Sequence, residues 1–600
     1  MPHQLPDIAI DAKNYPCDSW ELVQKGERLE QTWDRGFIGG MGQFLQGDEE
    51  RCYGGVNFDV TSPPFLRLGL RPAATISATD LDIAQPMYAF FAESPDGTNF
   101  AYILNDQRAY KVNMSNNNLE STHDFGAGAI CGRWALFETD YYVPLGASVN
   151  ARKLTAVTNA GGGNDTWTDV GVVALHFASL MKDGIAQLAR AHTINLVDLS
   201  ADGSSFVADD FEVGDTSLPI IDLLTWVAEL AVVKADSVYR FDVDGNSSPI
   251  QGFVGRSGSP TTTLSMSEVH GPYLYWMHHT GPWRVLSDRA QPLGPQSEFR
   301  YVRDTIGNVT GLENQNWSSA GAWGRWIYVS DLTAIHLGYI RDDGTVTWYW
   351  NITQPSGAAI FVAVTEGGIS GAPALWAVDT NNIYRYDLEP DGSIRSRVDT
   401  ASRGLTSTTH SFATSFTDLA RGSLRNKLKQ LRLMWVSTIG WPATVAPLQL
   451  GFEDEQGNNR NVGATIGSSG YFERTPTSGT NDTFRELAVT LSVVTTAGFA
   501  GDDPLIRSFG IEAVTASIYR AVIPLVSERI KGRRSMRRLL KDLRDLQNGA
   551  QVVIRDPENP SSSFNAQVVS VAEEAVSLGV GKVGYIVTVE LERFDWGAGV

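Results

Sequence analysis

The sequence has few cysteines, no long apolar run and no basic leader. Its three cysteines, Cys17, Cys52 and Cys131, are an odd number without Cys-x-x-Cys spacing, which argues against a disulfide framework and a zinc site. We therefore expect synthesis in a reducing cytoplasm. Nowhere do 18 uninterrupted apolar residues occur, and the N-terminus lacks a basic segment followed by an apolar one. A membrane span and secretion by a signal peptide are both disfavoured.

Positive charge is also scarce. The 600 residues carry 48 Lys and Arg against 68 Asp and Glu, a net charge of −20. Because phosphate binding needs clustered Lys and Arg, this charge argues against a nucleic-acid partner over most of the surface. The chain is rich in glycine (58), tyrosine (19) and tryptophan (16), which favours turns and strands. We expect a soluble, mainly β protein of several domains.

A strand cassette of seven residues recurs along the middle of the chain. The clearest copies are Ser237-Val-Tyr-Arg-Phe-Asp-Val243 and Asn382-Ile-Tyr-Arg-Tyr-Asp-Leu388. With degenerate copies included, the third position of the cassette falls at Tyr110, Lys153, Asn195, Tyr239, Trp283, His336 and Tyr384. A period of 40 to 50 residues with several short strands per unit is typical of a β-propeller, in which each repeat forms one four-stranded blade. The markers predict about seven blades over residues 71–404, with an array of β-sandwiches as the alternative.

Asp-Gly pairs follow four of the cassettes, at 202–203, 244–245, 343–344 and 391–392. Asp-Gly between apolar alternations is a strong signal for a tight hairpin. The turns therefore keep the same period as the strands.

After the last cassette the strands lengthen, and residues 405–515 show the alternation of a β-sandwich. The sets expected to share a face are Leu431, Leu433 and Trp435; Leu448, Leu450 and Phe452; and Leu487, Val489, Leu491 and Val493.

Residues 516–600 predict a small α+β domain. A strand at 519–526 is followed by a helix from about Ser535 to Leu546 and by three further strands. The apolar residues Met536, Leu539, Leu540, Leu543 and Leu546 fall on one face of that helix.

Residues 1–70 carry dense glycines, as in Gly36-Phe-Ile-Gly-Gly-Met-Gly42. We expect an irregular N-terminal arm that contacts a neighbouring molecule. The alternative is that it closes the first blade or covers the edge of the propeller.

Two parts of the chain resemble a known family. The run Pro504-Leu-Ile-Arg-Ser-Phe-Gly-Ile511, the helix Arg538-Leu-Leu-Lys-Asp-Leu-Arg-Asp-Leu546 and the closing strand Gly584-Tyr-Ile-Val-Thr-Val-Glu-Leu-Glu592 resemble the C-terminal regions of tailed-bacteriophage tail and baseplate proteins. The stretch from Asp48 to Gly69 is similar to the start of such proteins. The resemblance covers about a third of the chain, and its pattern is loose. It implies a structural protein of the virion tail, made in the host cytoplasm, whose terminal domain is similar to distal-tail modules that pack in rings.

The charge of the terminal domain gives a separate indication of assembly. Residues 516–600 contain 12 Lys and Arg against 10 Asp and Glu, near +2, so the remainder carries −22. Seven basic residues gather before and along the helix, facing away from its leucines: Lys531, Arg533, Arg534, Arg537, Arg538, Lys541 and Arg544. They form either a solvated helix face or a docking surface for an acidic neighbour, including another copy of this chain.

Signals for catalysis, cofactors or metals are weak. Asp342-Asp-Gly-Thr-Val-Thr-Trp348 departs in spacing from the Asp box of sialidase-like propellers, and Asp242-Val-Asp-Gly-Asn246 places its glycine too early for an EF-hand. The pairs Glu453 with Glu455 and Glu573 with Glu574 would suit glycoside hydrolysis only at a fixed separation. We expect no cofactor, no metal and no enzymatic activity.

Histidines and tryptophans leave two further possibilities. His270, His278 and His279 lie close in sequence, but neighbouring strand positions face opposite sides and do not easily chelate one ion. Trp348 and Trp350 could stack on sugar rings, although alternation favours their burial.

Two classes of function follow. The favoured one is a non-enzymatic structural protein of a phage tail, in the tail tip, baseplate or nozzle, assembling into a homo-oligomeric ring with other tail proteins through its terminal segments. The alternative is a tail module that binds a host receptor or a host-surface glycan. Fold does not choose between them, because propellers serve many functions.

Overall fold

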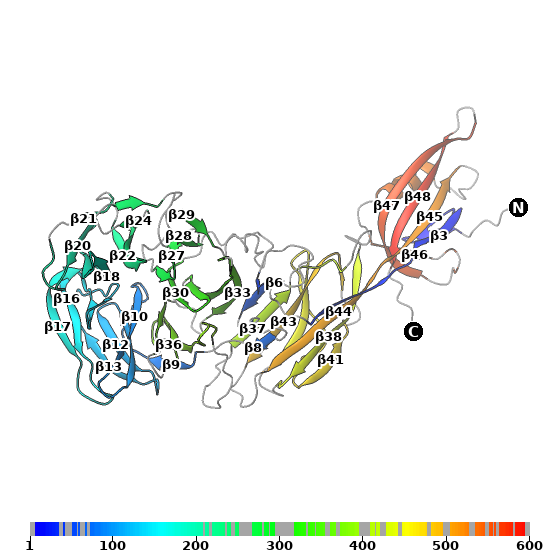
Figure 1. Cartoon of the computed structure of the whole chain (residues 1–600). Coiled ribbons are helices and arrows are strands. Elements are labelled where there is room, and N and C mark those ends of the chain that lie inside the picture. The colour runs from blue at the N-terminus through cyan, green and yellow to red at the C-terminus, as the bar shows by residue number, and fades with distance from the viewer. Residues whose placement is uncertain are drawn as a thin grey trace.

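The computed structural model contains three domains nested within one another along the chain (Figure 1). The chain begins in a terminal domain, passes through a β-sandwich into a β-propeller, and returns through the sandwich to the terminal domain. The structure describes residues 7–593 except 35–39, 42–50, 57, 60–65, 69–71, 208–210, 215–218, 235–236, 242–246, 251–266, 279–280, 287–288, 294–316, 332–333, 343, 354–360, 368–371, 395–407, 415, 420–427, 442–446, 477–481, 496–503, 527–534, 547–550, 556, 558, 560–562 and 580–582.

The propeller consists of seven sets of four antiparallel strands, as the repeat predicts. Blades 1 to 4 are β10–β13 (Met87–Glu93, Asn99–Asn105, Arg108–Asn113, Leu119–Asp124), β14–β17 (Ala135–Phe137, Asp140–Val143, Gly146–Ala156, Thr166–Ala174), β18–β21 (His176–Lys182, Ile185–Ala191, Leu196–Ser200, Phe211–Glu212) and β22–β25 (Ile220–Trp226, Glu229–Lys234, Val238–Phe241, Ser247–Pro249). Blades 5 to 7 are β26–β29 (Glu268–His270, Tyr273–His278, Gly281–Leu286, Arg289–Pro292), β30–β33 (Ser319–Trp323, Trp326–Ser330, Ala334–Ile340, Val346–Thr353) and β34–β36 (Phe361–Thr365, Ala374–Val378, Asn382–Asp387) with β9 (Ala74–Ser77).

The cassette marks the third strand of every blade. Tyr110 lies in β12 and Tyr384 in β36, and only Asn195 stands one residue outside its strand, before β20. The ring closes because β9, from the start of the propeller, pairs with β36 through Asn382 and Ser77. This closure leaves no open edge between the first and last blades.

The Asp-Gly turns form where the structure describes them. Gly203 and Gly392 have φ of 69° and 90°, a conformation that glycine adopts without strain. The Asp202 carboxylate accepts hydrogen bonds from the backbone N–H groups of Ser204 and Ser205 at 2.8 and 2.6 Å. The pair at 244–245 lies outside the described residues, as does Asp343 of the pair at 343–344.

The sandwich packs two sheets against a shared core. One sheet continues blade 6 through β6 (Arg51–Val56), β37 (Thr408–Thr414), β43 (Leu487–Thr495), β39 (Leu448–Asp454) and β40 (Asn459–Asn461), with β5 (Gly40–Met41) beside β6. The other contains β41 (Gly470–Arg474), β38 (Lys429–Ile439), β44 (Leu505–Thr515), β8 (Leu66–Leu68) and β7 (Phe58–Asp59), with β4 (Arg28–Trp33) and β42 (Thr483–Phe484) at its sides. Outer strand β33 of blade 6 pairs with β6 through Asn351 and Val56, and one hydrophobic core runs from the propeller into the sandwich.

Two of the three predicted sandwich faces are confirmed and one is wrong. The sets from Leu448 and from Leu487 are buried as expected. In β38, Leu431 is buried but Leu433 and Trp435 are only partly buried, while Met434 and Val436 fill the core. The register against β44 shifts between Leu431 and Leu433. This bulge reverses the alternation, because one extra residue moves the following side chains to the opposite face.

The expected irregular N-terminal arm over residues 1–70 is wrong where the structure describes it. In place of an arm, the segment supplies strands to two domains. β1 (Ile8–Ile10), β2 (Lys13–Tyr15) and β3 (Ser19–Gln24) belong to the sheet of the terminal domain, and β4 to β8 belong to the sandwich. The glycine-rich stretch 36–42 falls largely outside the described residues.

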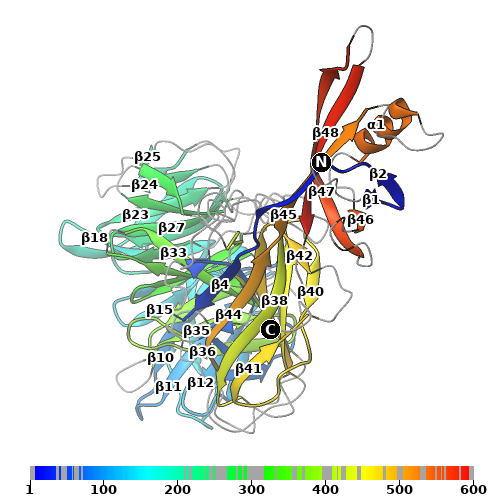
Figure 2. The same ribbon diagram turned by 90° about the vertical axis from the view of Figure 1, so that its right-hand side faces the viewer.

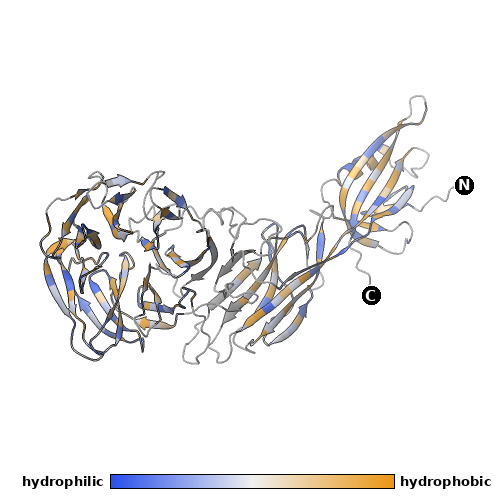
Figure 3. Cartoon of the chain, in the orientation of Figure 1, coloured by the Kyte–Doolittle hydropathy of each residue, from blue (hydrophilic) through white to orange (hydrophobic). Residues whose placement is uncertain are grey.

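The terminal domain is a seven-stranded sheet with one helix. Its order is β2, β1, β46 (Gln551–Arg555), β47 (Ser563–Ser577), β48 (Val583–Arg593), β45 (Ser517–Leu525) and β3. The helix α1 (Met536–Arg544) begins where the Ser535 side chain accepts a hydrogen bond from the Arg538 backbone N–H, a preferred N-cap arrangement. Leu539, Leu540 and Leu543 are buried against the sheet, as predicted. Figure 2 shows α1 beside the sheet, and Figure 3 shows apolar residues along the strands of this domain and of the propeller.

Two strands connect the terminal domain to the sandwich. β45 follows β44 after the single residue Ala516, and β4 follows β3 after residues 25–27. Between them, the Gly26 N–H donates to Ser517 Oγ at 2.9 Å and the Glu27 N–H to Thr515 Oγ1 at 2.8 Å. We call residues 25–27 and 515–517 the neck.

All three cysteines are buried thiols that form no disulfide with one another. No helix among the described residues has the length and apolar character needed to cross a membrane.

Candidate functional site

Four of the seven predicted docking residues lie in the described structure. Arg537, Arg538, Lys541 and Arg544 are exposed on α1. Lys531, Arg533 and Arg534 lie outside the described residues.

Some of these basic residues have partners within the domain. Arg544 forms an ion pair with Glu573 of β47, a contact that raises the pKa of the arginine and lowers that of the glutamate. Lys541 lies 3.8 Å from Asp545. Among the described residues, Arg537 and Arg538 form no ion pair.

The sequence candidates for catalysis have structural roles where they are described. Glu455 accepts hydrogen bonds from the backbone N–H groups of Arg485 and Glu486 at 3.1 and 3.3 Å, and Glu573 forms an ion pair with Arg544. These contacts hold both carboxylates in the folded structure. The possible calcium loop at 242–246 lies outside the described residues, and those that are described contain no metal-binding cluster.

The histidine and tryptophan candidates are only partly described. His270 Nε2 lies 2.6 Å from the Gly324 carbonyl oxygen, while His279 and the side chain of His278 lie outside the description. Trp348 is buried and donates to the Leu293 carbonyl. Burial is therefore confirmed for Trp348, and the side chain of Trp350 is not described.

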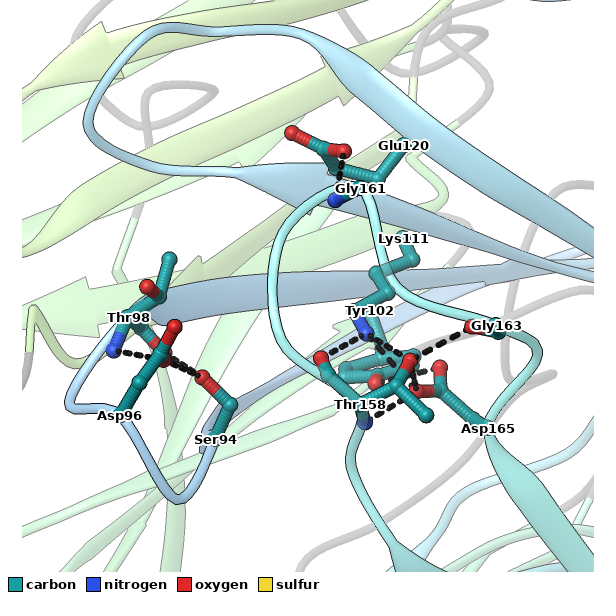
Figure 4. A network of polar contacts seen from close by, with 10 residues as sticks. All are labelled: Ser94, Asp96, Thr98, Tyr102, Lys111, Glu120, Thr158, Gly161, Gly163 and Asp165. Carbon is teal, nitrogen blue, oxygen red and sulfur yellow. Dashed lines mark hydrogen bonds and ion pairs between the residues drawn. The ribbon is translucent and has the colours of Figure 1, made fainter.

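A buried polar network joins blades 1 and 2 (Figure 4). Lys111 Nζ lies 2.7 Å from Asp165 Oδ1, and each side chain is only 4% exposed. The Tyr102 hydroxyl donates to Asp165 Oδ2 at 2.7 Å, and Thr158 donates its backbone N–H to Oδ1 at 2.8 Å. We call these four residues the interblade clasp.

The interblade clasp is arranged for stability. Burial raises the pKa of Asp165, but hydrogen bonds from Lys111, Thr158 and Tyr102 overcome this and lower it below its usual value. Burial and Asp165 raise the pKa of Tyr102. With an ionised aspartate and a neutral tyrosine fixed at neutral pH, neither group is poised to transfer a proton.

A second polar cluster lies where first strands of the blades converge. Arg133, just before blade 2, binds Asp222 of β22 through Nε–Oδ1 and Nη2–Oδ2 contacts of 2.6 and 2.9 Å. Asp222 has no exposed side-chain surface. The Arg133 backbone N–H donates to Nδ1 of His176 in β18 at 3.2 Å, and its guanidinium lies 5.3 Å from the Tyr88 ring in β10.

Burial shifts the pKa values of two titratable groups in this second polar cluster. Burial and the Arg133 charge, opposed by Asp222, lower the pKa of His176 to about 4. Burial raises the pKa of Glu268 in β26 to about 7 despite the attraction of Arg133. At neutral pH His176 is therefore neutral, and with Nδ1 accepting, its proton lies on Nε2.

A pocket of about 350 Å³ opens over this cluster. It is bordered by the starts of blades 1 to 4, with Tyr88, Ile130, Cys131, Gly132, His176 and Ile220 among its lining residues. We call it the axial pocket. Burial raises the pKa of the Cys131 thiol, which disfavours the thiolate that a nucleophilic cysteine needs. Gly132 stands where a Cβ would lie 1.8 Å from the Leu175 carbonyl oxygen.

Sequence reasoning gave no sign of the axial pocket. Arg133 and Asp222 are 89 residues apart, and His176 belongs to no motif. The one feature of the sequence that could have indicated the pocket is the repeat, because it places the starts of successive blades around one axis.

Comparisons with known proteins identify no family for this chain. No protein-family model matches the chain, and no curated protein sequence matches it. Similar solved structures include virginiamycin B lyase from Staphylococcus aureus (10% identity, 52% of this chain and 98% of that one, TM-score 0.36). They also include hydrazine synthase from Kuenenia stuttgartiensis (13% identity, 52% and 98%, TM-score 0.36) and the WD40 β-propeller domain of Doa1 (10% identity, 54% and 97%, TM-score 0.33).

These neighbours include enzymes as well as a WD40 domain. At such low identity the likeness says nothing about activity. None of these names belongs to a phage tail, so that resemblance stays a prediction.

Proposed function

We propose that this chain is a non-enzymatic structural protein of a phage tail, attached to its neighbours by the terminal domain. The observation that carries the proposal is that the strands near both ends of the chain form one domain. β1 to β3 share one sheet with β45 to β48, in which β1 pairs with β46 and β3 with β45, at the end of the molecule away from the propeller (Figure 1). The sequence resemblance to tail and baseplate proteins supplies the setting.

The sandwich is suited to be a rigid spacer between the terminal domain and the propeller. The sandwich shares a sheet and a hydrophobic core with blade 6, so these two domains behave as one body. The terminal domain is joined to that body by the neck. An attached terminal domain would therefore hold the propeller at a distance from the rest of the tail.

The surface of the terminal domain offers contacts for assembly. Its edge strand β3 exposes Leu22 and Val23, at 47% and 43% of their surface, and a strand edge with exposed apolar residues can pair with another chain. Arg537 and Arg538 add positive charge. The sandwich and propeller are strongly acidic, so a copy of this chain is one suitable partner.

The test is the mass of the full-length protein by light scattering at low and high salt, together with negative-stain images. We expect a closed ring or stable multimer that weakens at high salt, because exposed ion pairs are screened. The double variant Arg537→Glu with Arg538→Glu should shift the protein toward monomer. The matched control is Arg289→Glu with Arg341→Glu, which makes the same charge change on the propeller and should leave the mass unaltered.

A monomer at every concentration and salt would contradict self-assembly. Equal masses for the wild type and the α1 variant would contradict docking through this helix.

The second candidate is a receptor-binding module. The observation that favours it is the axial pocket, carried by the domain farthest from the termini. Its mainly aliphatic and glycine lining differs from the stacked aromatic faces typical of glycan sites. A glycan screen against the full-length chain tests this candidate, and saturable binding to a host-surface saccharide would favour it over a purely structural role.

A further inference from the structure

The axial pocket contains two polar groups that the fold does not use. Tyr88 is 3% exposed and His176 is 8% exposed. Among the described residues, neither the Tyr88 hydroxyl nor His176 Nε2 has a hydrogen-bond partner, although both side chains line the pocket. Neither atom is enclosed by protein, since neither is among the fully buried polar atoms without a partner. Both can therefore be reached from the cavity, where a ligand atom can bond to them.

The two groups are held in a defined relation. Their rings meet edge to face, with centroids 6.4 Å apart. His176 Nδ1 accepts a hydrogen bond from the Arg133 backbone N–H. The ring proton is therefore on Nε2, which remains able to donate. Tyr88 packs against the Arg133 guanidinium, so neither ring turns freely. A carbonyl oxygen has two lone pairs and can accept from both donors.

The charges around the axial pocket disfavour an anionic ligand. Arg133 is neutralised by its two contacts with Asp222, and it also donates to the Ser267 carbonyl oxygen. His176 is neutral at neutral pH. A carboxylate or phosphate would therefore lose its hydration without meeting a free cation, which is unfavourable.

We propose that the axial pocket binds an uncharged acyl or amide group, whose carbonyl oxygen accepts from the Tyr88 hydroxyl and from His176 Nε2–H. A compact branched apolar substituent on that ligand packs against Ile130, Leu175 and Ile220, which line the same cavity. The inference does not depend on the proposed tail function, because it rests on the propeller alone.

The first experiment measures binding of N-acetyl-leucine amide to the full-length protein by saturation-transfer NMR and titration. This probe has amide carbonyls and a branched apolar side chain. For so small a ligand, we expect a Kd of about 1 mM or lower. N-acetyl-leucine, which has nearly the same size but carries a carboxylate, should bind at least about tenfold more weakly.

Two variants locate the binding. Tyr88→Phe keeps the ring beside Arg133 and removes only the hydroxyl, so we expect the amide to bind about five- to tenfold more weakly. Ala147→Trp fills the rim of the pocket at an exposed position and should abolish binding. The control Ala201→Trp, at an exposed turn after β20, should leave binding unchanged.

A capped peptide with a central leucine distinguishes the two sources of such a ligand. Tighter binding of the peptide than of the single amide would identify a protein segment as the natural occupant. Binding of the small amide alone would identify a free small molecule. Absence of amide binding, or binding that survives both Tyr88→Phe and Ala147→Trp, would overturn the proposal.

Discussion

Two lysine–aspartate ion pairs in adjacent parts of the propeller have the same chemistry in different surroundings. Lys111 and Asp165 join blades 1 and 2 at 2.7 Å with 4% of each side chain exposed. Lys153 and Asp140 lie 2.9 Å apart within blade 2, with 29% and 23% exposed. An exposed pair contributes little to stability, whereas removing one partner of a buried pair leaves a charge without compensation.

We therefore expect Lys111→Met to destabilise the propeller by about 3–5 kcal/mol, because Asp165 stays buried without its cation. Lys153→Met, the matched control, should cost less than about 1 kcal/mol. Scanning calorimetry of the propeller transition measures both variants. Similar shifts for the two would mean that burial does not set the strength of the interblade clasp.

For single residues, the sequence predicts the strand in which a residue lies better than it predicts the residue that it contacts. The cassette placed Lys111 in a strand, where it lies, but its aspartate is 54 residues away. Nothing in the local pattern distinguishes this lysine from Lys153. The axial pocket was missed for the same reason, since Tyr88 and His176 meet only after blades 1 and 3 have assembled.

At the scale of helices and strands, sequence periodicity predicted the repeated strands of the propeller. It assigned side chains to the wrong face where one extra residue interrupts a strand. The markers gave the third strand of each blade, and the leucine spacing gave α1. The bulge after Leu431 carries no signal in the alternation, so Leu433 and Trp435 were assigned to the wrong face. Segment 1–70 reads as an arm in the sequence because its short strands complete distant sheets and have no partner nearby in sequence.

The neck gives a prediction at this scale. A Cβ on Gly26 would lie 2.3 Å from the Thr515 carbonyl oxygen and 3.3 Å from Ser517 Oγ. Gly26→Ala should therefore push the two connecting strands apart, at a cost of about 1–3 kcal/mol. Hydrogen exchange should report faster exchange at the Gly26 and Glu27 amides, whose bonds to Ser517 and Thr515 would be lost.

Gly163→Ala is the control for the neck variant, since its added methyl group would meet no atom within 4 Å. If both variants left exchange at the neck unchanged, the close approach of these strands would not be what holds the terminal domain to the sandwich.

At the scale of the whole molecule, nesting changes both the charge and the boundaries of the terminal domain. Residues 516–600 alone are near +2, but residues 7–24, which share the sheet, add one lysine and four acidic residues. The complete domain is then near −1. Because the domain as a whole is nearly neutral, electrostatic docking through it would depend on a local cluster of charge, such as Arg537 and Arg538 on α1, and not on its net charge.

Because the terminal domain is built from both ends of the chain, a truncation that tests its role must remove both ends. Deleting residues 516–600 alone would leave β1 and β3 without β46 and β45, their partners in the sheet. Ile8, Ile10 and Trp20, which are 0%, 1% and 9% exposed, would then face water. We expect that variant to aggregate, since unpaired apolar strands associate with one another.

A chain of residues 27–515 removes the terminal domain from both ends at once. It keeps every strand of the sandwich from Arg28 to Thr515 and all seven blades, so the propeller transition should match that of the full-length protein. If the terminal domain is responsible for assembly, light scattering should find this chain monomeric where the full-length protein forms a multimer. A multimer of unchanged order from residues 27–515 would move the assembly contacts to the sandwich or propeller. A soluble product from the single deletion would show that β1 to β3 do not need their C-terminal partners.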